Sequence, residues 1–268
     1  MSSVLYLFLA HLGVGIACTL PLVPKEAGLK FFRFNTGMAA ALIAAAITFR
    51  PDATLAGASV ANTVANPASL TALSVTLGAL TLYWITAGRV LTALRPVLLA
   101  VGAVAGLATA VLHGLAAASV SGAPLTVIST VTSATLLGGA CTAMVLGHWY
   151  LILPSMQVSY LQRIVGFHIL TLAARVALFA AVLVLAWQEP LPAGQSVRHY
   201  VTSLDGIFFW QRALFGLAAP IVLSWLTWET AKIRSTQSAT GILYVDFFTV
   251  VVGEIMASYV LLSIGLAV

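Results

Sequence analysis

Residues 162–187 read QRIVGFHILTLAARVALFAAVLVLAW, and this stretch decides the fold class of the chain. A bilayer core about 30 Å thick is crossed by one helix of roughly 20 mostly apolar residues. The stretch has that length and that character, yet His168 and Arg175 lie within it. It therefore predicts a transmembrane helix that carries ionisable side chains inside the membrane.

Stretches of this kind follow one another along the chain, separated by proline and charged residues that are typical of boundaries. They cover residues 4–23, 31–49, 69–87, 97–118, 126–153, 162–187, 207–228 and 240–266. No linker between them is long enough to divide the chain. We therefore expect an all-α fold, in which residues 1–268 form a single transmembrane domain, a polytopic bundle of about eight membrane helices.

The composition excludes several classes of protein. Of the 268 residues, 61% are hydrophobic and 7% are charged, whereas soluble domains have about 45–50% apolar and about 25% charged residues. A soluble enzyme, a nucleic-acid-binding domain and a disordered chain are all excluded on this ground. The formal net charge of +5 comes from the loops, so it indicates membrane lipid rather than nucleic acid as the surroundings.

Lysine and arginine are distributed unevenly over the loops, which predicts the orientation in the membrane. The loops after the first, third, fifth and seventh stretches have eight of these residues, and the other loops have two, Arg50 and Arg198. The eight are Lys25, Lys30, Arg33, Arg89, Arg95, Arg163, Lys232 and Arg234. The pattern places both termini outside and predicts an integral protein of the bacterial inner (plasma) membrane.

Ionisable side chains inside a membrane are costly, so each one is a functional candidate. The spans contain His11, His113, His148, His168, Arg175, Arg212, Asp246 and Glu254, with Glu229 nearer an edge. At a rise of 1.5 Å per residue, His11 and His113 lie roughly 8–10 Å below the outer surface. His148 and His168 lie roughly 8–9 Å above the inner surface. The four histidines thus form two level pairs.

Level pairs on different helices are what two bis-histidine b-type haems require, because each iron takes one imidazole from each face. We therefore expect two haems b, with His11 and His113 on one iron and His148 and His168 on the other. The alternative is four unrelated histidines that hydrogen-bond to neighbouring helices or line a polar cavity.

The other buried charges have expected roles around these haems. Arg175 and Arg212 suit haem propionates because a guanidinium binds a carboxylate with two hydrogen bonds. Either arginine can instead neutralise Glu254 in a structural ion pair. Asp246 lies at the level of the inner histidines, and both Asp246 and Glu254 are candidate proton donors or acceptors at a quinone site. A carboxylate bonded to a neighbouring Ser, Thr or Arg is the plainer interpretation of Asp246.

With its paired histidines, the chain resembles the di-haem b-type membrane subunits of respiratory quinone oxidoreductases. The resemblance rests on the architecture and on His11, His113, His148 and His168. The segment Gln237–Tyr244 (QSATGILY), with Gly253 and Glu254 after it, is similar to the last span of quinone-reactive anchor subunits in the polysulfide and dimethyl-sulfoxide reductase group. Those anchors bind quinone without haem, and the histidine-rich spans depart from that group.

Three interpretations of function follow. The first is an electron-transfer subunit with two haems that relays electrons between quinone and other redox subunits of a membrane complex. The chain has neither a CxxCH motif nor an iron–sulfur cysteine run, so it would be one subunit of an oxidoreductase rather than a whole enzyme. The second is a haem-free quinone-binding anchor. The third is a proton-coupled transporter that uses the intramembrane His, Asp, Glu and Arg residues.

Overall fold

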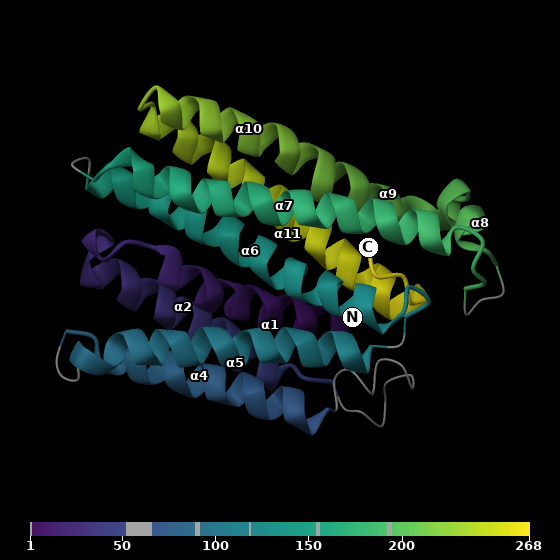
Figure 1. Cartoon of the computed structure of the whole chain (residues 1–268), viewed down its shortest axis with the longest axis horizontal. Helices are drawn as coiled ribbons and strands as arrows, with labels where there is room; N and C mark the ends of the chain where they lie inside the picture. The colour runs from purple at the N-terminus through teal and green to yellow at the C-terminus, as the bar shows by residue number, and fades with distance from the viewer. Residues whose placement is uncertain (1, 52–65, 89–91, 118, 154–155, 192–194) are drawn as a thin grey trace.

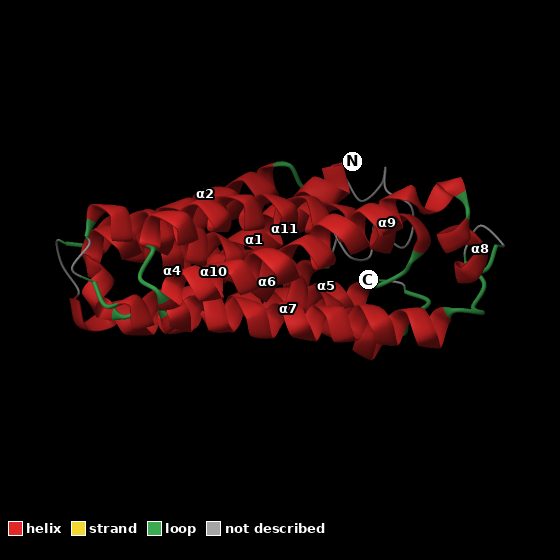
Figure 2. Cartoon of the chain, turned by 90° about the horizontal axis from the view of Figure 1, so that it is seen from above, coloured by secondary structure: helices red, strands yellow, loops and turns green. Residues whose placement is uncertain are grey.

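The computed structural model describes residues 2–51, 66–88, 92–117, 119–153, 156–191 and 195–268, and within these ranges it is helical, without a β-strand. The long helices lie side by side along one axis, as Figures 1 and 2 show. They are α1 (Ser2–Thr19), α2 (Gly28–Thr48), α4 (Pro67–Thr86), α5 (Arg95–Ala116), α6 (Ala123–Ile152), α7 (Val158–Ala186) and α11 (Thr236–Ile264). The seventh span is composite and contains α9 (Ile207–Ala213) and α10 (Ala219–Lys232), and the short α8 (Val197–Thr202) precedes it.

The prediction of eight spans is confirmed, because eight helical segments in the described part of the chain are long and apolar enough to cross a membrane. Both termini lie at the same end of the bundle (Figure 1), which we call the terminal end. We call the opposite end the basic end, because Lys25, Lys30, Arg95, Arg163, Lys232 and Arg234 lie on the helix ends and turns there. Arg89 lies outside the described residues.

The bundle has two halves that meet between α1 and α6. Helices α1, α2, α4 and α5 form one half and α6, α7, α10 and α11 form the other (Figure 1). Gly15 and Gly138 lie at the contact, where a Cβ atom on Gly15 would be 1.9 Å from the carbonyl oxygen of Ala134. A hydrogen bond of 2.6 Å between Thr19 and Thr142 joins the hydroxyl groups nearby. Small residues therefore bring the two backbones into direct contact, as membrane helices often do.

The seventh span is broken near its middle. Its α-helical hydrogen bonding is interrupted by a π-helical turn at Leu214–Ala218, directly before α10 and its Pro220. A proline has no N–H to donate to the carbonyl four residues earlier, which here belongs to Gly216. That carbonyl therefore needs another donor, and the break positions it beside the buried arginine of the same span.

Candidate functional site

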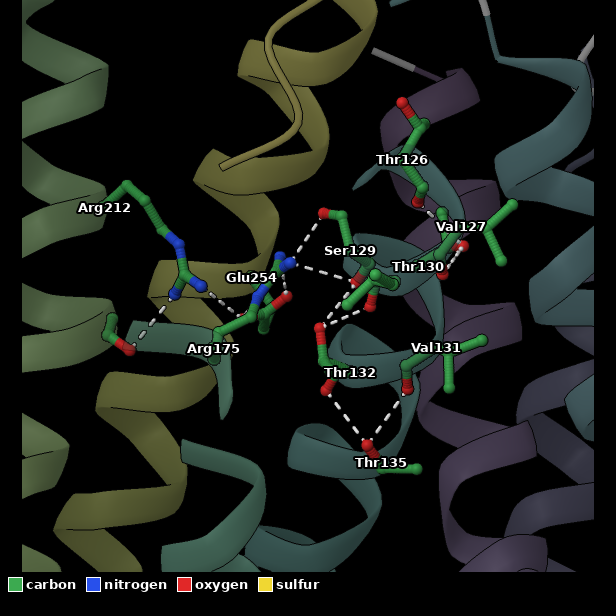
Figure 3. A network of polar contacts seen from close by, with 12 residues as sticks. Thr126, Val127, Ser129, Thr130, Val131, Thr132, Thr135, Arg175, Arg212 and Glu254 are labelled. Atoms are coloured by element: carbon green, nitrogen blue, oxygen red, sulfur yellow. Dashed lines mark hydrogen bonds and ion pairs between the residues drawn. The ribbon is translucent and has the colours of Figure 1, made fainter. Parts of the chain in front are cut away.

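A buried ion cluster joins three helices at a level nearer the terminal end than the basic end of the bundle (Figure 3). Glu254 on α11 lies between Arg175 on α7 and Arg212 on α9, and we call these three residues the Arg–Glu–Arg cluster. Arg175 binds the carboxylate through two nitrogens, with Nε at 3.2 Å from Oε1 and Nη2 at 3.0 Å from Oε2. Nη2 of Arg212 lies 2.9 Å from Oε1. The three side chains are 2%, 0% and 1% exposed for Arg175, Arg212 and Glu254, so the ions are shielded from solvent.

The break in the seventh span holds Arg212 in place. Its Nη1 donates to the carbonyl of Gly216 at 3.1 Å, which is the acceptor that Pro220 leaves without a helical donor. A Cβ atom on Gly216 would be 2.3 Å from Nη1 of Arg212 and 2.6 Å from the Cα of Gly253. Two glycines and one proline therefore make the room and supply the acceptor that this guanidinium needs.

Ser129 on α6 binds the side of Arg175 that faces away from Glu254. Nη1 of Arg175 donates to the hydroxyl of Ser129 at 2.6 Å and to its carbonyl at 3.0 Å. The cluster still has one more positive than negative charge, and Nε of Arg212 has no hydrogen-bond partner among the described residues. A buried charge without full pairing costs folding free energy, so the excess positive charge of this cluster lowers the stability of the fold.

A second buried pair lies closer to the basic end on the same two helices. Nε2 of His168 on α7 is 2.9 Å from Oδ2 of Asp246 on α11, and both side chains are fully buried. The hydroxyls of Thr171 and Thr249 donate to the backbone carbonyls of His168 and Asp246, at 2.9 and 2.8 Å. Within the described chain, Nδ1 of His168 and Oδ1 of Asp246 have no partner, so each atom is available for one further hydrogen bond.

A third buried group lies at the terminal end of the other half. Nε2 of His11 on α1 is 3.3 Å from Nδ1 of His113 on α5, and the hydroxyl of Tyr6 is 3.3 Å from Nε2 of His113. His11 is 3% exposed and His113 is fully buried. The three side chains form a hydrogen-bonded row. Each histidine in it can accept a proton at one ring nitrogen and release another proton from the second ring nitrogen.

A small cavity connects this row to the Arg–Glu–Arg cluster. It has a volume of about 10 Å³ and is lined by His11, Arg175, Ser129, Ser133 and Ser258, among others. A cavity of roughly 10–15 Å³ is about the size of one water molecule, provided that polar groups surround it. The space between α1, α6, α7 and α11 is therefore suited to a single bridging water.

The predicted pairing of the histidines is only partly reproduced. His11 and His113 meet as expected, but His168 pairs with Asp246 and His148 has a different neighbour. The side chain of His148 is exposed on the surface of the bundle, with Nδ1 at 3.3 Å from the hydroxyl of Tyr244. The two inner histidines were expected to face one another, and the structure gives each of them another partner.

The two predicted haems have no room in this packing. The ring nitrogens of His11 and His113 are already in contact, whereas axial ligands need an iron and a macrocycle between them. Gly114, which follows His113, packs against α6, where a Cβ atom would be 2.5 Å from the Cα of Val127. The cavity beside His11 is water-sized. Likewise, no three His, Cys, Asp or Glu residues gather as a metal site in the described chain. The residues as packed do not fit a haem.

The other candidates for cofactor binding and proton transfer form one ion cluster, made of Arg175, Arg212 and Glu254. This is the alternative in which an arginine neutralises Glu254 in a structural ion pair. Asp246 binds a histidine instead of the Ser, Thr or Arg of the plainer interpretation. Tyr6 and Ser129 were missed because a lone tyrosine or serine in an apolar span gives no periodic signal of its role.

Fold and site together define a polytopic helical membrane protein whose interior contains paired ionisable side chains. Comparison with family models, with curated proteins and with solved structures finds no match for the chain.

Proposed function

We propose that this chain is a haem-free, proton-transferring membrane subunit of a quinone-linked redox complex. One observation supports the proposal above the others: buried ionisable pairs follow one another through the bundle. The His168–Asp246 pair comes first from the basic end, then the Arg–Glu–Arg cluster, and then the row of His11, His113 and Tyr6. Ionisable groups in such a sequence are typical of proton relays in membranes.

Proton exchange begins in this proposal at the His168–Asp246 pair. An imidazole bound to a carboxylate takes or releases one proton without creating an isolated charge, since the partner compensates it. Nδ1 of His168 and Oδ1 of Asp246 are without partners in the described chain, and in this proposal they are the atoms at which protons enter or leave the relay. This pair therefore keeps the proton role that the sequence suggested for Asp246.

The second segment leads toward the terminal end. Eight residues separate Asp246 from Glu254 along α11, an interval of roughly 12 Å. From the cluster, a water in the small cavity would reach His11, and the 3.3 Å contacts continue to His113 and Tyr6. Tyr6 is bonded to His113, which lies three residues before the end of α5 at Ala116, so this row ends close to the membrane surface.

The Arg–Glu–Arg cluster controls the flow in this proposal. Its excess positive charge raises the energy of a proton that passes beside it, as an arginine does in pores that exclude protons. Conduction at rest is therefore slow. Movement of the Glu254 carboxylate away from one arginine would change the charge beside the proton path, and a redox partner would act through this movement.

The charge distribution supports an orientation with both termini outside and the basic end in the cytoplasm of a bacterial cell, because lysine and arginine favour that side. In this orientation the His168–Asp246 pair exchanges protons with the cytoplasmic side. The row from His11 to Tyr6 exchanges them with the outside.

The test is proton uptake by proteoliposomes that contain a pH-sensitive dye, driven by a potassium diffusion potential. We expect wild-type flux above that of protein-free vesicles, and a fall of at least about tenfold in Asp246→Asn, since the relay loses its proton-binding carboxylate. Arg212→Gln should conduct faster because the barrier charge is gone. The matched control is Glu229→Gln, whose carboxylate is exposed and pairs with Lys232. Equal flux in Asp246→Asn and wild type would refute the proposal.

A proton-coupled transporter of an anion is the second candidate. The broken seventh span favours it, because transporters build substrate sites at discontinuous helices and π-helical turns often mark functional positions. Arg212, with its unpartnered Nε in the described chain, lies at this break. Isolation of the chain alone, without redox subunits, together with anion-dependent proton uptake would favour the transporter over the redox subunit.

A further inference from the structure

The basic end has a polar cavity between the α6–α7 turn and the α10–α11 turn. Its volume is about 820 Å³, and its polar lining includes Ser159, Gln162, Lys232, Arg234 and Thr236. No aspartate or glutamate belongs to its lining within the described chain. Two cations without an opposing carboxylate in the wall make this cavity attractive to an anion.

An apolar groove begins one helical turn deeper in the membrane. It has a volume of about 740 Å³ between α7 and α10, and Gly166, Ala173, Trp225 and Trp228 are in its wall. Gln162 in the polar cavity precedes Gly166 in the groove by four residues on α7. Trp228 likewise precedes Lys232 by four residues on α10. The two spaces therefore follow each other along the same pair of helices, polar at the surface and apolar below.

The two cations differ in how they are engaged. Nζ of Lys232 lies 2.6 Å from Oε1 of Glu229, but both side chains are about half exposed, at 49% and 45%, and such surface pairs are weak. The guanidinium of Arg234 forms no ion pair with another described residue. Arg234 is thus free to bind a ligand, and Lys232 is able to exchange its partner.

The backbone of Arg234 gives an independent indication. Its φ angle is +58°, and it is the one described residue other than glycine with a positive φ. It ends α10 as a left-handed cap, with its N–H donating to Ala231 and that of Ser235 donating to Thr230. Glycine adopts this conformation without strain and is the usual residue there. An arginine is strained in this conformation, so the backbone does not explain its presence. The reason for an arginine at this position therefore lies in its side chain.

We propose that the basic cavity and the apolar groove together bind one anionic phospholipid. The phosphate binds Lys232 and Arg234, with the polar groups of Ser159, Gln162 and Thr236 around it. One acyl chain lies in the groove between α7 and α10, against Trp225 and Trp228. Basic pockets between membrane helices recognise anionic headgroups in this way. The proposal is independent of proton transfer, because no residue of the His168–Asp246 pair, of the Arg–Glu–Arg cluster or of the row from His11 to Tyr6 is part of the lipid site.

The experiment measures thermal unfolding of the delipidated full chain in detergent, with phosphatidylglycerol, phosphatidylcholine or inorganic phosphate added. We expect phosphatidylglycerol to raise Tm by about 5 °C, the shift that a ligand near a hundredfold its Kd gives a chain of this size. Phosphatidylcholine and phosphate should give little or no shift. An equal shift with phosphatidylcholine would show that the headgroup charge is not read, and an equal shift with phosphate would show a site for a free anion. Either outcome would overturn the proposal.

Arg234→Gly is the decisive variant, because structure and binding predict opposite effects. Glycine relieves the backbone strain, so Tm without lipid should stay equal or rise. The shift caused by phosphatidylglycerol should fall to less than about half, because one of the two headgroup cations is gone. Lys232→Gln is the second variant, with the same expected loss. The matched control is Arg163→Gln, an exposed cation near the same end of α7 that does not line the cavity. An undiminished shift in both variants would overturn the proposal.

A second readout locates the acyl chain. Phosphatidylglycerol with brominated acyl chains should quench tryptophan fluorescence, and Ala173→Phe, which fills the groove, should reduce the quenching. Wild-type quenching in Ala173→Phe would show that the acyl chain lies elsewhere.

Discussion

Replacing Glu254 by glutamine tests whether the Arg–Glu–Arg cluster is held together by charge. The substitution retains the size and the hydrogen-bonding oxygen of the side chain but removes the negative charge between the two guanidiniums. Arg175 and Arg212 are 2% and 0% exposed, so solvent cannot replace the lost carboxylate. The local charge rises from one to two positive charges in a buried site.

The expected effect is large. Breaking a buried ion pair by removing one partner costs about 3–5 kcal/mol, because a charge is left buried without compensation. Here the carboxylate has two cationic partners, at 2.9 and 3.0 Å, so the loss should not fall below that range. For a chain of this length 1 kcal/mol corresponds to roughly 2–4 °C in Tm. We therefore expect Glu254→Gln to lower Tm by roughly 6–20 °C.

Thermal unfolding in detergent is followed with a thiol-reactive dye, since Cys141 is 2% exposed and becomes reactive only on unfolding. Glu229→Gln is the control, because its half-exposed pair with Lys232 is worth only about 0.2–1 kcal/mol. Combining Glu254→Gln with Arg212→Gln removes one cation and should recover part of the loss. A decrease in Tm no larger than that of the control would refute the view that charge holds the cluster together. Hydrogen bonds that glutamine can also form would then be what holds it.

Two further outcomes are expected. A Cβ atom on Gly138 would be 2.0 Å from the backbone of Gly15, whereas one on Gly139 has its nearest neighbour at 3.4 Å. Gly138→Ala should therefore lower the free energy of unfolding by about 1–3 kcal/mol or more through overpacking, and Gly139→Ala should stay within about 1 kcal/mol of wild type. Chemical and thermal unfolding will measure both. A dithionite-reduced minus oxidised visible spectrum of the purified chain should have no α-band, because the packed His11 and His113 rings leave no space for a macrocycle, and about two haems b per chain would show that this packing opens to admit them.

The spans were predictable because a bilayer imposes one requirement on every backbone that crosses it. Each polar backbone group must be bonded within the segment, so a long apolar stretch becomes a helix. Depth along each helix was predictable for the same reason, since the rise per residue is fixed. The contact between His11 and His113 follows from their equal depth, and Asp246 was likewise expected at the level of His168.

The direction in which a side chain points was not predictable. In a soluble helix the polar face identifies the exposed side, but these helices are apolar all round, so that signal is missing. His148 and His168 were placed at one depth, yet His148 is exposed on the surface of the bundle and His168 is fully buried. Packing of α6 against α7 and α11 decides that rotation. The sequence pattern of a single helix does not contain it.

The break in the seventh span and the buried charges are parts of one arrangement. Pro220 leaves the Gly216 carbonyl without its helical donor, and Arg212 supplies a donor at 3.1 Å. Apolar side chains of similar volume often replace a buried ion cluster with no loss of stability, or with a gain. A bundle that required only stability would have no need for a proline, two close glycines and three buried ions at one place. Stability alone therefore does not account for this arrangement, whereas a site that changes its charge or its partners during function does.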